Sequence, residues 1–475
     1  MTSFFFAIMG KYKLNTYHKK IIADTITPVE VYLKIRDVFP NSLLLESSDY
    51  RSSNNNFSFI CFNEIGSIKI KNFVLEEKFP DGKNSRQELN KSINIPEIIH
   101  KYLDKFDIDN NEHKFINNGL FGFISHESIK YFENISLSEG KQDLDIPDIF
   151  YGLYQNIIAI SLFNHEAHIF CNSYDKKNNI ETIENLLISK SYPVFSYNNI
   201  GEKISDISDD DFMEYVRKAK SHCKRGDVFQ LVLSRRFKQK FKGDEFNVYR
   251  SLRSINPSPY LFFFDYGDFK IFGSSPEAQI IINDRLAEIH PIAGTFKRTG
   301  NDEDDNKIAE ELFKDPKENS EHVMLVDLAR NDLGRSGNDI KVEKNKEIQF
   351  YSHVIHLVSK VTARLKKNSK TFQVVADTFP AGTLSGAPKH MALKLIDKYE
   401  KVNRNFYGGA IGYVDFKGNF NHAIIIRSFL SQNNLLNYQA GAGIVIDSQP
   451  EKELQEVYNK LGALDKALKN AELIK

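Results

Sequence analysis

Residues 260–272, Tyr-Leu-Phe-Phe-Phe-Asp-Tyr-Gly-Asp-Phe-Lys-Ile-Phe, give the clearest indication of the architecture. Two strand-like apolar runs, Tyr260–Tyr266 and Phe269–Phe272, flank a Tyr-Gly-Asp sequence that is typical of a hairpin turn. The same arrangement recurs around residues 416–419, Phe-Lys-Gly-Asn, between the runs Ala410–Phe416 and Ala423–Phe429. Strands joined by such short turns are antiparallel, so this part of the chain predicts antiparallel sheet.

Further strand-like runs occur along the chain, and amphipathic helical patterns alternate with them. Hairpin-connected strands mixed with separate helices indicate an α+β architecture, not a repeating βαβ one. The polar, turn-rich segment Tyr197–Asp210 is the best candidate for a boundary, so we predict two regions, residues 1–200 and residues 209–475. The other strand-like runs are Leu43–Glu46, Phe57–Phe62, Ile68–Val74, Ile157–Leu162 and Ala167–Cys171; the helical patterns are Asp210–Arg225, Glu318–Leu328, Lys389–Tyr399 and Pro450–Leu473.

The composition of the 475-residue chain is that of a soluble globular protein. Lys+Arg and Asp+Glu both number 63, which argues against binding to nucleic acid or to an anionic membrane. The apolar run Phe4–Met9 is too short to span a bilayer and lacks the flanking features of a signal peptide. Three scattered cysteines (Cys61, Cys171 and Cys223) are typical of thiols in a reducing cytoplasm. Neither glycine-rich nucleotide-binding motif occurs, so a nucleotide cradle is not supported.

Two segments carry glutamates three residues apart, a spacing that places both carboxylates on one face of a helix. The first pair, Glu318 and Glu321, follows Asp315-Pro316, a typical helix start in which Glu318 completes a capping box. Glu321 precedes a strongly apolar run, residues 323–326. Its carboxylate therefore borders a buried surface and needs a partner or a metal ion.

The second pair, Glu453 and Glu456, lies on the last helical pattern, whose apolar stripe runs from Leu454 to Leu468. Its spacing alone favours solvated glutamates on a helix surface. A few carboxylates, with waters and substrate oxygens, are nevertheless how proteins usually hold Mg²⁺. Periodicity does not bring the two helices together, so both interpretations stay open.

Two elements could contact an anionic ligand through their backbone. Residues 383–389, Thr-Leu-Ser-Gly-Ala-Pro-Lys, form a predicted turn before a helix, where Thr383 and backbone amides could receive an anion. The small residues of Gln439–Gly443 permit close approach of the backbone to a ligand.

Three side chains could act beside these elements. Arg427 ends the apolar strand 424–426 and is suited to bind a carboxylate in bidentate fashion. Tyr407, before Gly408-Gly409, could supply a hydroxyl to the same anion. His356 lies in the apolar segment 354–358, where a lone histidine is more often a satisfied core residue than a functional one.

In their order and spacing, these segments are similar to the chorismate-utilising enzymes and, within that family, to the large (component I) subunits of anthranilate synthase. The similarity covers nearly the whole chain and is stronger after Asp209. It implies large antiparallel sheets packed with helices in two interleaved subdomains. The segments that carry it are Gly226–Phe237, Gly273–Glu277, Pro291–Thr295, Asp327–Asp332, Phe379–Lys389 and Gln439–Gly443, with Leu44–Ser47, Gly122-Phe123, Tyr131–Glu133 and Pro147-Asp148 in the N-terminal part.

The resemblance implies a Mg²⁺ ion bound by Glu321 and Glu456, with Glu318 and Glu453 holding metal-bound water. The ion would bind and neutralise the ring carboxylate of chorismate. A pocket for the enolpyruvyl carboxylate is implied at Tyr407, Arg427 and the backbone of Gly441, Ala442 and Gly443.

The resemblance also implies the residues that act on the ring. Glu277 matches the general acid that protonates the departing C4 hydroxyl, a task that suits a partly desolvated, protonated carboxyl. Thr295, His356 and Thr383 match contacts with the ring.

Two positions separate the branches of this family. Relatives that add water to chorismate carry a lysine base at the position of Gln230, whereas ammonia is a neutral nucleophile that needs no such base. Aminodeoxychorismate synthases typically carry a nucleophilic lysine in place of Ala293. Both residues therefore favour direct addition of ammonia at C2.

A tryptophan-binding element is implied by two further segments. Leu44–Ser47 and Asn256–Tyr260 resemble the allosteric site of the family, with Glu46 and Ser47 holding the charged groups of the amino acid and Asn256, Pro257, Pro259 and Tyr260 beside them. The simpler interpretation of Glu46 is the end of a buried strand.

The sequence therefore predicts a Mg²⁺-dependent lyase that makes anthranilate and pyruvate from chorismate and ammonia and is inhibited by tryptophan. No glutaminase module is evident, so a separate glutamine amidotransferase subunit is expected to supply the ammonia. The alternatives are an aminodeoxychorismate synthase, against which Ala293 argues, and a catalytically inactive amino-acid-sensing subunit, against which the set of polar site residues argues.

Overall fold

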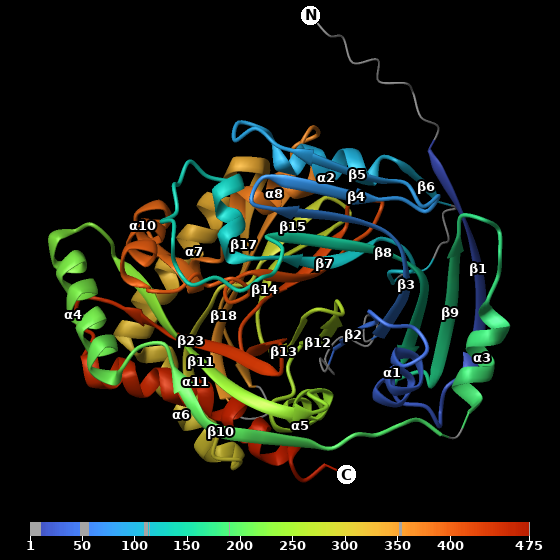
Figure 1. Ribbon diagram of the computed structural model, residues 1–475. Coiled ribbons are helices and arrows are strands. Elements are labelled where there is room, and N and C mark those ends of the chain that lie inside the picture. The colour runs from blue at the N-terminus through green and yellow to red at the C-terminus, as the bar shows by residue number, and fades with distance from the viewer. Residues whose placement is uncertain are drawn as a thin grey trace, which may run out of the picture.

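The structure of the protein, a computed structural model, describes residues 11–47, 57–108, 113, 115–189, 191–350 and 354–474, without the side chains of residues 295, 297 and 317. The run Phe4–Met9 lies outside the described residues. The fold is α+β, as predicted, with antiparallel sheets covered by helices (Figure 1). No helix in the described ranges is long and apolar enough to cross a membrane.

Two long strands, β3 (Phe57–Lys71) and β8 (Ile149–Ser161), form an antiparallel ladder from which two sheets extend. The first sheet continues from the beginning of β3 through the strands that carry most of the predicted ligand-binding backbone. In order of pairing these are β2 (Leu43–Glu46), β12 (Tyr260–Asp265), β13 (Lys270–Ser275), β22 (Ser428–Gln432), β23 (Leu435–Ile444), β11 (Gln230–Gly243) and β10 (Tyr197–Ser205).

Four more strands complete this first sheet. A two-residue strand, β19 (Gly386–Ala387), pairs with the start of β11. On the β8 side the sheet ends with β9 (Glu166–Ser173), β1 (Tyr12–Ile22) and β6 (Phe106–Ile108).

The second sheet continues from the end of β3 and the beginning of β8. On the β3 side it ends with β4 (Val74–Lys78) and β5 (Asn84–Glu88). On the β8 side it runs through β7 (Leu120–Ile124), β20 (Ala410–Val414), β21 (Phe420–Ile424), β14 (Ala278–Asn283), β15 (Leu286–Ile289) and β18 (Val354–Leu365), which also pairs with β16 (Ile292–Lys297) and β17 (Gly337–Phe350).

A predominantly aromatic core fills the space between the two sheets. Phe123 of β7 and Phe264 of β12 are fully buried in the same apolar cluster as Leu430 of β22. Strands from before residue 200 also pair directly with strands from after residue 209, as β2 does with β12 and β7 with β20. The two sequence regions are thus joined by shared sheets, and their division at residues 200–209 stays a prediction.

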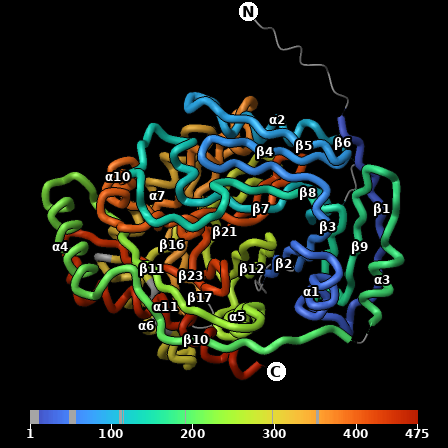
Figure 2. Tube along the Cα trace, viewed as in Figure 1, coloured from blue at the N-terminus to red at the C-terminus, as the bar shows by residue number. Residues whose placement is uncertain are grey.

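The helices lie outside the sheets, and Figure 2 follows the chain through them. The C-terminal helix α11 contacts β23, α4 and α5. The bounds of the helices are α1 (Pro28–Arg36), α2 (Ile95–Leu103), α3 (Ile180–Ile188), α4 (Asp209–Arg225), α5 (Phe246–Ile255), α6 (Asp302–Lys314), α7 (Pro316–Ser336), α8 (Thr371–Thr378), α9 (Gly382–Ser385), α10 (Lys389–Tyr399) and α11 (Pro450–Ala471), with a 3₁₀ helix at His126–Tyr131.

Local sequence signals account for several of these boundaries. The carboxylate of Asp315 accepts a hydrogen bond from the Glu318 amide at 2.9 Å, which is the predicted capping interaction at the start of α7. Helix α4 begins after Ser208, whose hydroxyl accepts from the Asp211 amide, and it ends at Gly226 with φ +79°. The predicted helix Lys389–Tyr399 matches α10 at both ends.

Some predictions were wrong in detail. The run Ile68–Val74 contains a turn, because β3 ends at Lys71 and β4 begins at Val74. The run Ala423–Phe429 is not one strand, because β21 ends at Ile424 and β22 begins at Ser428, with Arg427 between them at φ +50°. The segment Tyr197–Asp210 has fewer turns than we expected, since Tyr197–Ser205 forms β10 at the edge of the first sheet. Most side chains of β10 are exposed, so an edge strand there accommodates polar residues without a burial cost.

Candidate active site

The predicted site residues come from both sheets and from helices α7 and α11. Gln230 opens β11, Gly441–Gly443 close β23, Glu277 lies between β13 and β14, and Arg427 lies between β21 and β22. Hydrogen bonds and ion pairs connect several of these positions. Residues more than 200 positions apart in the chain are therefore brought together in one site.

Glu277 is positioned by Thr383, whose hydroxyl donates a hydrogen bond of 3.0 Å to its Oε1 atom. Burial raises the pKa of the Glu277 carboxyl from 4.5 to about 7, although the Thr383 hydrogen bond and the charges of Lys460 and Arg427 act in the opposite direction. The carboxyl can therefore hold a proton near neutral pH, which is the property required of a general acid. Thr383 lies in α9, a single turn of four residues, and contacts this carboxyl; the anion site expected before α10 stays a prediction.

His356 is buried in β18, and its Nδ1 atom lies 2.7 Å from the carbonyl oxygen of Gly294. A carbonyl oxygen only accepts, so Nδ1 donates the hydrogen. Burial, together with the charge of Arg427, lowers the pKa of His356 to about 4 against the opposing effect of the Gly294 hydrogen bond, so the imidazole is neutral at physiological pH. The backbone conformation and the packing of Gly294 explain why that residue is a glycine: φ is +67°, and a Cβ atom there would lie 2.5 Å from Leu312.

Arg427 and Tyr407 lie on the side of the site formed by β22 and β23. The guanidinium of Arg427 is close enough to Glu277 and His356 for its charge to affect the pKa of both. Burial raises the pKa of the Tyr407 hydroxyl, and the Gly441 amide acts against that shift. The left-handed φ of Arg427 places this arginine at the junction of two strands, at a conformational cost of about 1 kcal/mol or more.

Gln230 connects β11 to α7. Its side chain is 2% exposed, and its Nε2 atom donates a 2.7 Å hydrogen bond to Oε1 of Glu321. The Oε1 atom of Gln230 is buried without a hydrogen-bond partner among the described residues. A Cβ atom at Gly443 would lie 2.7 Å from Nε2, so glycine at that position leaves room for the amide.

Glu456 of α11 forms an ion pair with Lys460, one turn further on, at 2.7 Å. The Lys460 ammonium also donates to the carbonyl oxygen of Gly441 at 2.9 Å. Our sequence reasoning missed Lys460, although its i, i+4 spacing from Glu456 is a recognisable ion-pair signal. Glu453 is only 4% exposed, so the interpretation of this glutamate as a solvated helix residue was wrong.

The carboxylates of Glu321 and Glu456 are suited to a Mg²⁺ ion by their chemistry and their placement. Glu321 is linked through Gln230 to the surroundings of Gly443, and Glu456 is linked through Lys460 to Gly441, so the two flank one short piece of β23. No set of three histidine, cysteine or acidic side chains gathers as metal ligands within the described residues. Mg²⁺ is often held by one or two carboxylates with water and substrate oxygens, so two carboxylates fit such an ion.

A buried ion pair behind the site was not found from the sequence. Arg404 and Glu400 are 1% and 3% exposed and meet at 2.6 Å. The guanidinium lies 5.7 Å from the ring centre of Tyr407 and donates to the Leu384 and Val232 carbonyl oxygens. Sequence spacing shows the i, i+4 pair, but it gives no indication that both residues are buried.

The predicted tryptophan-site residues lie at the end of β2 and directly after it, and in the segment that leads into the first residue of β12, Tyr260. Glu46 pairs with Leu261 across the strands, and its carboxylate accepts hydrogen bonds from Tyr249 at 2.6 Å and from Arg253 at 2.8 Å. Asn256 donates to the Ser274 carbonyl oxygen at 3.4 Å. Glu46 is thus a buried strand end and, at the same time, adjoins the second predicted segment. The side chain of Thr295 in β16 lies outside what the structure describes.

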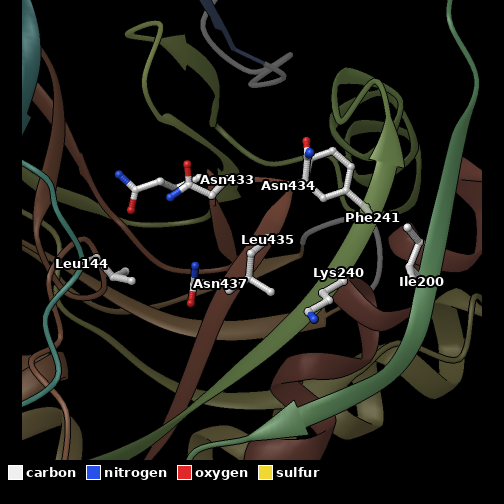
Figure 3. A pocket seen from close by; sticks show the side chains of 9 residues that line it. Leu144, Ile200, Lys240, Phe241, Asn433, Asn434, Leu435 and Asn437 are labelled. Atoms are coloured by element: carbon white, nitrogen blue, oxygen red, sulfur yellow. The ribbon is translucent and has the colours of Figure 1, made fainter.

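Two cavities lie away from these residues, beside the far end of β11. Figure 3 shows the smaller, of about 460 Å³. A larger one of about 1000 Å³ adjoins it through Phe241 and residues 432–434. None of the predicted site residues lines either cavity, so both are separate from the site described above. The lining residues in Figure 3 are Leu144, Ile200, Lys240, Phe241, Gln432, Asn433, Asn434, Leu435 and Asn437.

Comparison with known proteins gives the family. A family model described as chorismate binding enzyme matches residues 58–466, which is most of the chain. The chain belongs to the chorismate-binding enzyme family. Anthranilate synthase component 1 of Aquifex aeolicus is 34% identical over 97% of this chain and 96% of its own length. The corresponding protein of Methanothermobacter marburgensis is 38% identical over 94% of this chain and 93% of its own.

Solved structures agree with the family assignment. The crystal structure of anthranilate synthase component I from Streptococcus pneumoniae matches with a TM-score of 0.75 at 29% identity, over 94% of this chain and 99% of that one. The menaquinone-specific isochorismate synthase MenF of Escherichia coli matches with a TM-score of 0.73 at 18% identity, over 96% and 95% of the two chains, and so shares the fold. The family resemblance inferred from the sequence is confirmed.

The raised pKa of Glu277 predicts a pH-dependent effect on stability. Its folded-state pKa of about 7 lies above its ordinary 4.5, so the folded chain favours the protonated form and loses stability as the pH rises through 7. We expect Glu277→Gln to exceed the wild type in thermal stability at pH 8, by on the order of 1–3 kcal/mol, and to match it near pH 4. The control Glu451→Gln, exposed on α11, should show no such pH-dependent difference. Equal gains at both pH values would contradict the raised pKa.

Proposed function

We propose that the chain acts as component 1 of an anthranilate synthase. It combines chorismate with ammonia to give anthranilate, pyruvate and water. Full-length similarity to several proteins of that name supports this assignment. The observation that carries the amination is the environment of Gln230, the position where the family resemblance puts a lysine base in relatives that add water.

Gln230 supplies an acceptor and no base. Its Nε2 atom is engaged by Glu321, which leaves the buried Oε1 atom to accept a hydrogen bond from an N–H group of ammonia. Activating water would instead require a group that removes a proton. Ala293, which is 5% exposed in β16, offers no nucleophile that could form a covalent intermediate. Both features favour direct attack of ammonia on ring carbon C2.

Glu277 acts as the proton donor in this proposal. When ammonia attacks C2, the ring double bonds shift and the C4 hydroxyl leaves with the proton of Glu277, as water. The 3.0 Å hydrogen bond from Thr383 then stabilises the carboxylate that remains. Loss of the ring proton at C2 and of the enolpyruvyl group, which departs as pyruvate, completes the aromatic ring.

The anionic groups of the substrate determine its orientation. Arg427 and Tyr407, with the backbone of Gly441–Gly443, bind the enolpyruvyl carboxylate. Neutral His356 contacts the ring and adds no second positive charge beside Arg427. Glu321 and Glu456 bind Mg²⁺, with Glu318 and Glu453 placed for metal-bound water. When bound, the ion neutralises the ring carboxylate and draws electron density from the ring.

Ammonia is supplied by a separate glutamine amidotransferase subunit in this proposal. The relatives are named component 1, which implies a second component. Tryptophan, the product of the pathway that anthranilate begins, binds at Glu46, Ser47 and Asn256–Tyr260 and inhibits the enzyme. The Glu46 carboxylate, which now accepts from Tyr249 and Arg253, would then be shared with the ammonium group of the amino acid.

The central experiment mixes the purified chain with chorismate, Mg²⁺ and ammonium. We expect anthranilate and pyruvate in equal amounts. Anthranilate is monitored by its fluorescence, and the products are identified by chromatography. A parallel reaction without ammonium is the control and should yield neither. Formation of aminodeoxychorismate or isochorismate in place of anthranilate would overturn the proposal.

The metal assignment predicts that replacing either of two glutamates lowers activity and weakens Mg²⁺ binding. Removing the charge of a ligand weakens ion binding at least as much as removing an outer-shell partner, so Glu321→Gln and Glu456→Gln should each lower ammonium-dependent kcat/KM by about 100-fold or more. The midpoint of the Mg²⁺ titration should also rise. Glu451→Gln on the same helix α11 serves as the matched control. Unchanged Mg²⁺ titrations in both variants would refute the assignment.

The tryptophan assignment predicts loss of inhibition when one charge is removed. Glu46→Gln keeps an acceptor for Tyr249 and Arg253 but lacks the negative charge that an ammonium group requires. We expect wild-type activity to fall on titration with tryptophan, and the variant to need at least about tenfold more tryptophan, which corresponds to 1.4 kcal/mol. A wild type that tryptophan leaves unaffected would rule the site out.

A further inference from the structure

Lys389 lies at a position that its own helix does not favour. It is the first residue of α10, where the unpaired backbone amides and the helix dipole disfavour a cation. Its side chain is only 12% exposed, although lysine is among the residue types that are almost never fully buried unless paired. The reason for a largely buried cation at this helix start must therefore come from outside α10.

The Lys389 ammonium contacts two other segments. It lies 2.7 Å from the Asp332 carboxylate of α7 and donates to the Thr378 carbonyl oxygen, at the end of α8, at 2.9 Å. The Asp332 side chain is 14% exposed, and burial raises the pKa of its carboxyl although the charge of Lys389 acts in the opposite direction. Both charged groups are thus poorly solvated and form an ion pair with each other.

The same segment is attached to α7 at a second point. Ala387 of β19 pairs with Gln230 of β11, and the Gln230 side chain donates to the Glu321 carboxylate of α7. The segment Ala387–Lys389 therefore holds α7 at two residues, Glu321 through Gln230 and Asp332 directly. Both helices, α7 and α10, lie on the left side of Figures 1 and 2.

The two attachment points lie on one side of α7. Glu321 and Asp332 are about three helical turns apart, so their side chains leave the helix in nearly the same direction. Between them α9 packs closely on α7, since a Cβ atom at Gly382 would collide with the Leu328 side chain. A helix that is held at two points on one face cannot rotate or slide without breaking one of the two contacts.

We propose that Lys389 is a positioning residue that holds the Glu321 carboxylate of α7 where the Mg²⁺ ion binds. The inference rests on the proposed function, in which Glu321 is a ligand of that ion. The Lys389 ammonium is engaged by Asp332 and Thr378, so this lysine acts through α7 and not by contact with the ion.

Lys389 also relates the metal side of the site to the proton donor. The Thr378 hydroxyl accepts from Gln279 at 3.1 Å, and Gln279 follows Glu277 by two positions at the start of β14. Thr383, which donates to Glu277, precedes Lys389 in the same segment. One ammonium group thus contacts the helix of the metal carboxylate and the end of α8 that is bonded to the strand beside the acid.

A matched ion pair in the same helix separates positioning from simple stabilisation. Lys141 and Asp397 also meet at 2.7 Å, with side chains 13% and 15% exposed, and Asp397 lies near the other end of α10. This pair joins α10 to the N-terminal part of the chain and does not involve α7. Its loss should therefore lower stability without affecting the metal site.

The experiment measures Mg²⁺ binding to the full chain by calorimetry, with chorismate present and ammonium absent so that no turnover occurs. Lys389→Met removes the charge and keeps the length of the side chain. We expect the Mg²⁺ Kd to rise by about tenfold or more, the lower limit of the effects typical of outer-shell residues. Asp332→Asn keeps an acceptor for the ammonium and should change the Kd in the same direction, also where Lys389→Met does not fold. The control Lys141→Met should lower the melting temperature as Lys389→Met does and leave the Mg²⁺ Kd unchanged.

A double variant tests whether Lys389 acts through Glu321. Glu321→Gln removes the ligand that Lys389 is inferred to position. Lys389→Met should therefore lower the ammonium-dependent kcat/KM much less in the Glu321→Gln background than in the wild type. Equal fold reductions in both backgrounds would show that Lys389 acts independently of Glu321, and would overturn the proposal.

Wild-type Mg²⁺ affinity in Lys389→Met and Asp332→Asn would also overturn it, as would an equal loss of affinity in Lys141→Met. Absence of anthranilate from the wild type with ammonium would instead refute the proposed function. The calorimetric titration does not depend on turnover, so these two failures are distinguishable.

Discussion

The guanidinium of Arg404 lies almost without solvent exposure between the elements that build the site. It pairs with Glu400 and donates to backbone oxygens of β11 and of α9. The backbone amide of Arg404 donates to Glu127 in the N-terminal part of the chain. Glu400 in turn accepts from the backbone and hydroxyl of Ser234. Removing one partner of such a pair leaves an uncompensated buried charge, which lowers the free energy of unfolding by about 3–5 kcal/mol. The spacing between β11, α9 and Tyr407 depends on it.

In the site that this pair supports, burial and nearby charges act in opposite directions on the pKa of Glu277. Arg427 and Lys460 would keep Glu277 ionised, yet burial prevails and holds the carboxyl near neutrality. The same burial keeps His356 uncharged. In our proposal Glu277 is the proton donor and His356 a neutral ring contact, and the uncharged imidazole adds no positive charge beside Arg427.

The amide of Gln230 and the ammonium of Lys460 engage the two carboxylates that we assign to the metal ion. Each contact joins a helix to a strand. Gln230 links Glu321 of α7 to β11, and Lys460 links Glu456 of α11 to Gly441 of β23. A bound cation would compete with both donors and loosen them. Binding of the ion, placement of the nucleophile and the position of β23 are consequently linked in our proposal.

Local signals in the sequence were sufficient for the α+β class, the hairpin at residues 260–272, the start of α7 and both ends of α10, because turns, caps and periodicity act over a few residues. Ordered segments were sufficient for the family, whereas the roles of Gln230 and Ala293 in selecting the nucleophile stay predictions. Which polar residues are buried could not be predicted from such local signals. Glu453 looked solvated and is buried, and Ala423–Phe429 looked continuous and is broken at Arg427. The spacing of Glu400 and Arg404 did not indicate that this pair is buried. In each case the outcome depends on contacts between residues distant in the chain, which sheet pairing and packing create and which no local pattern encodes.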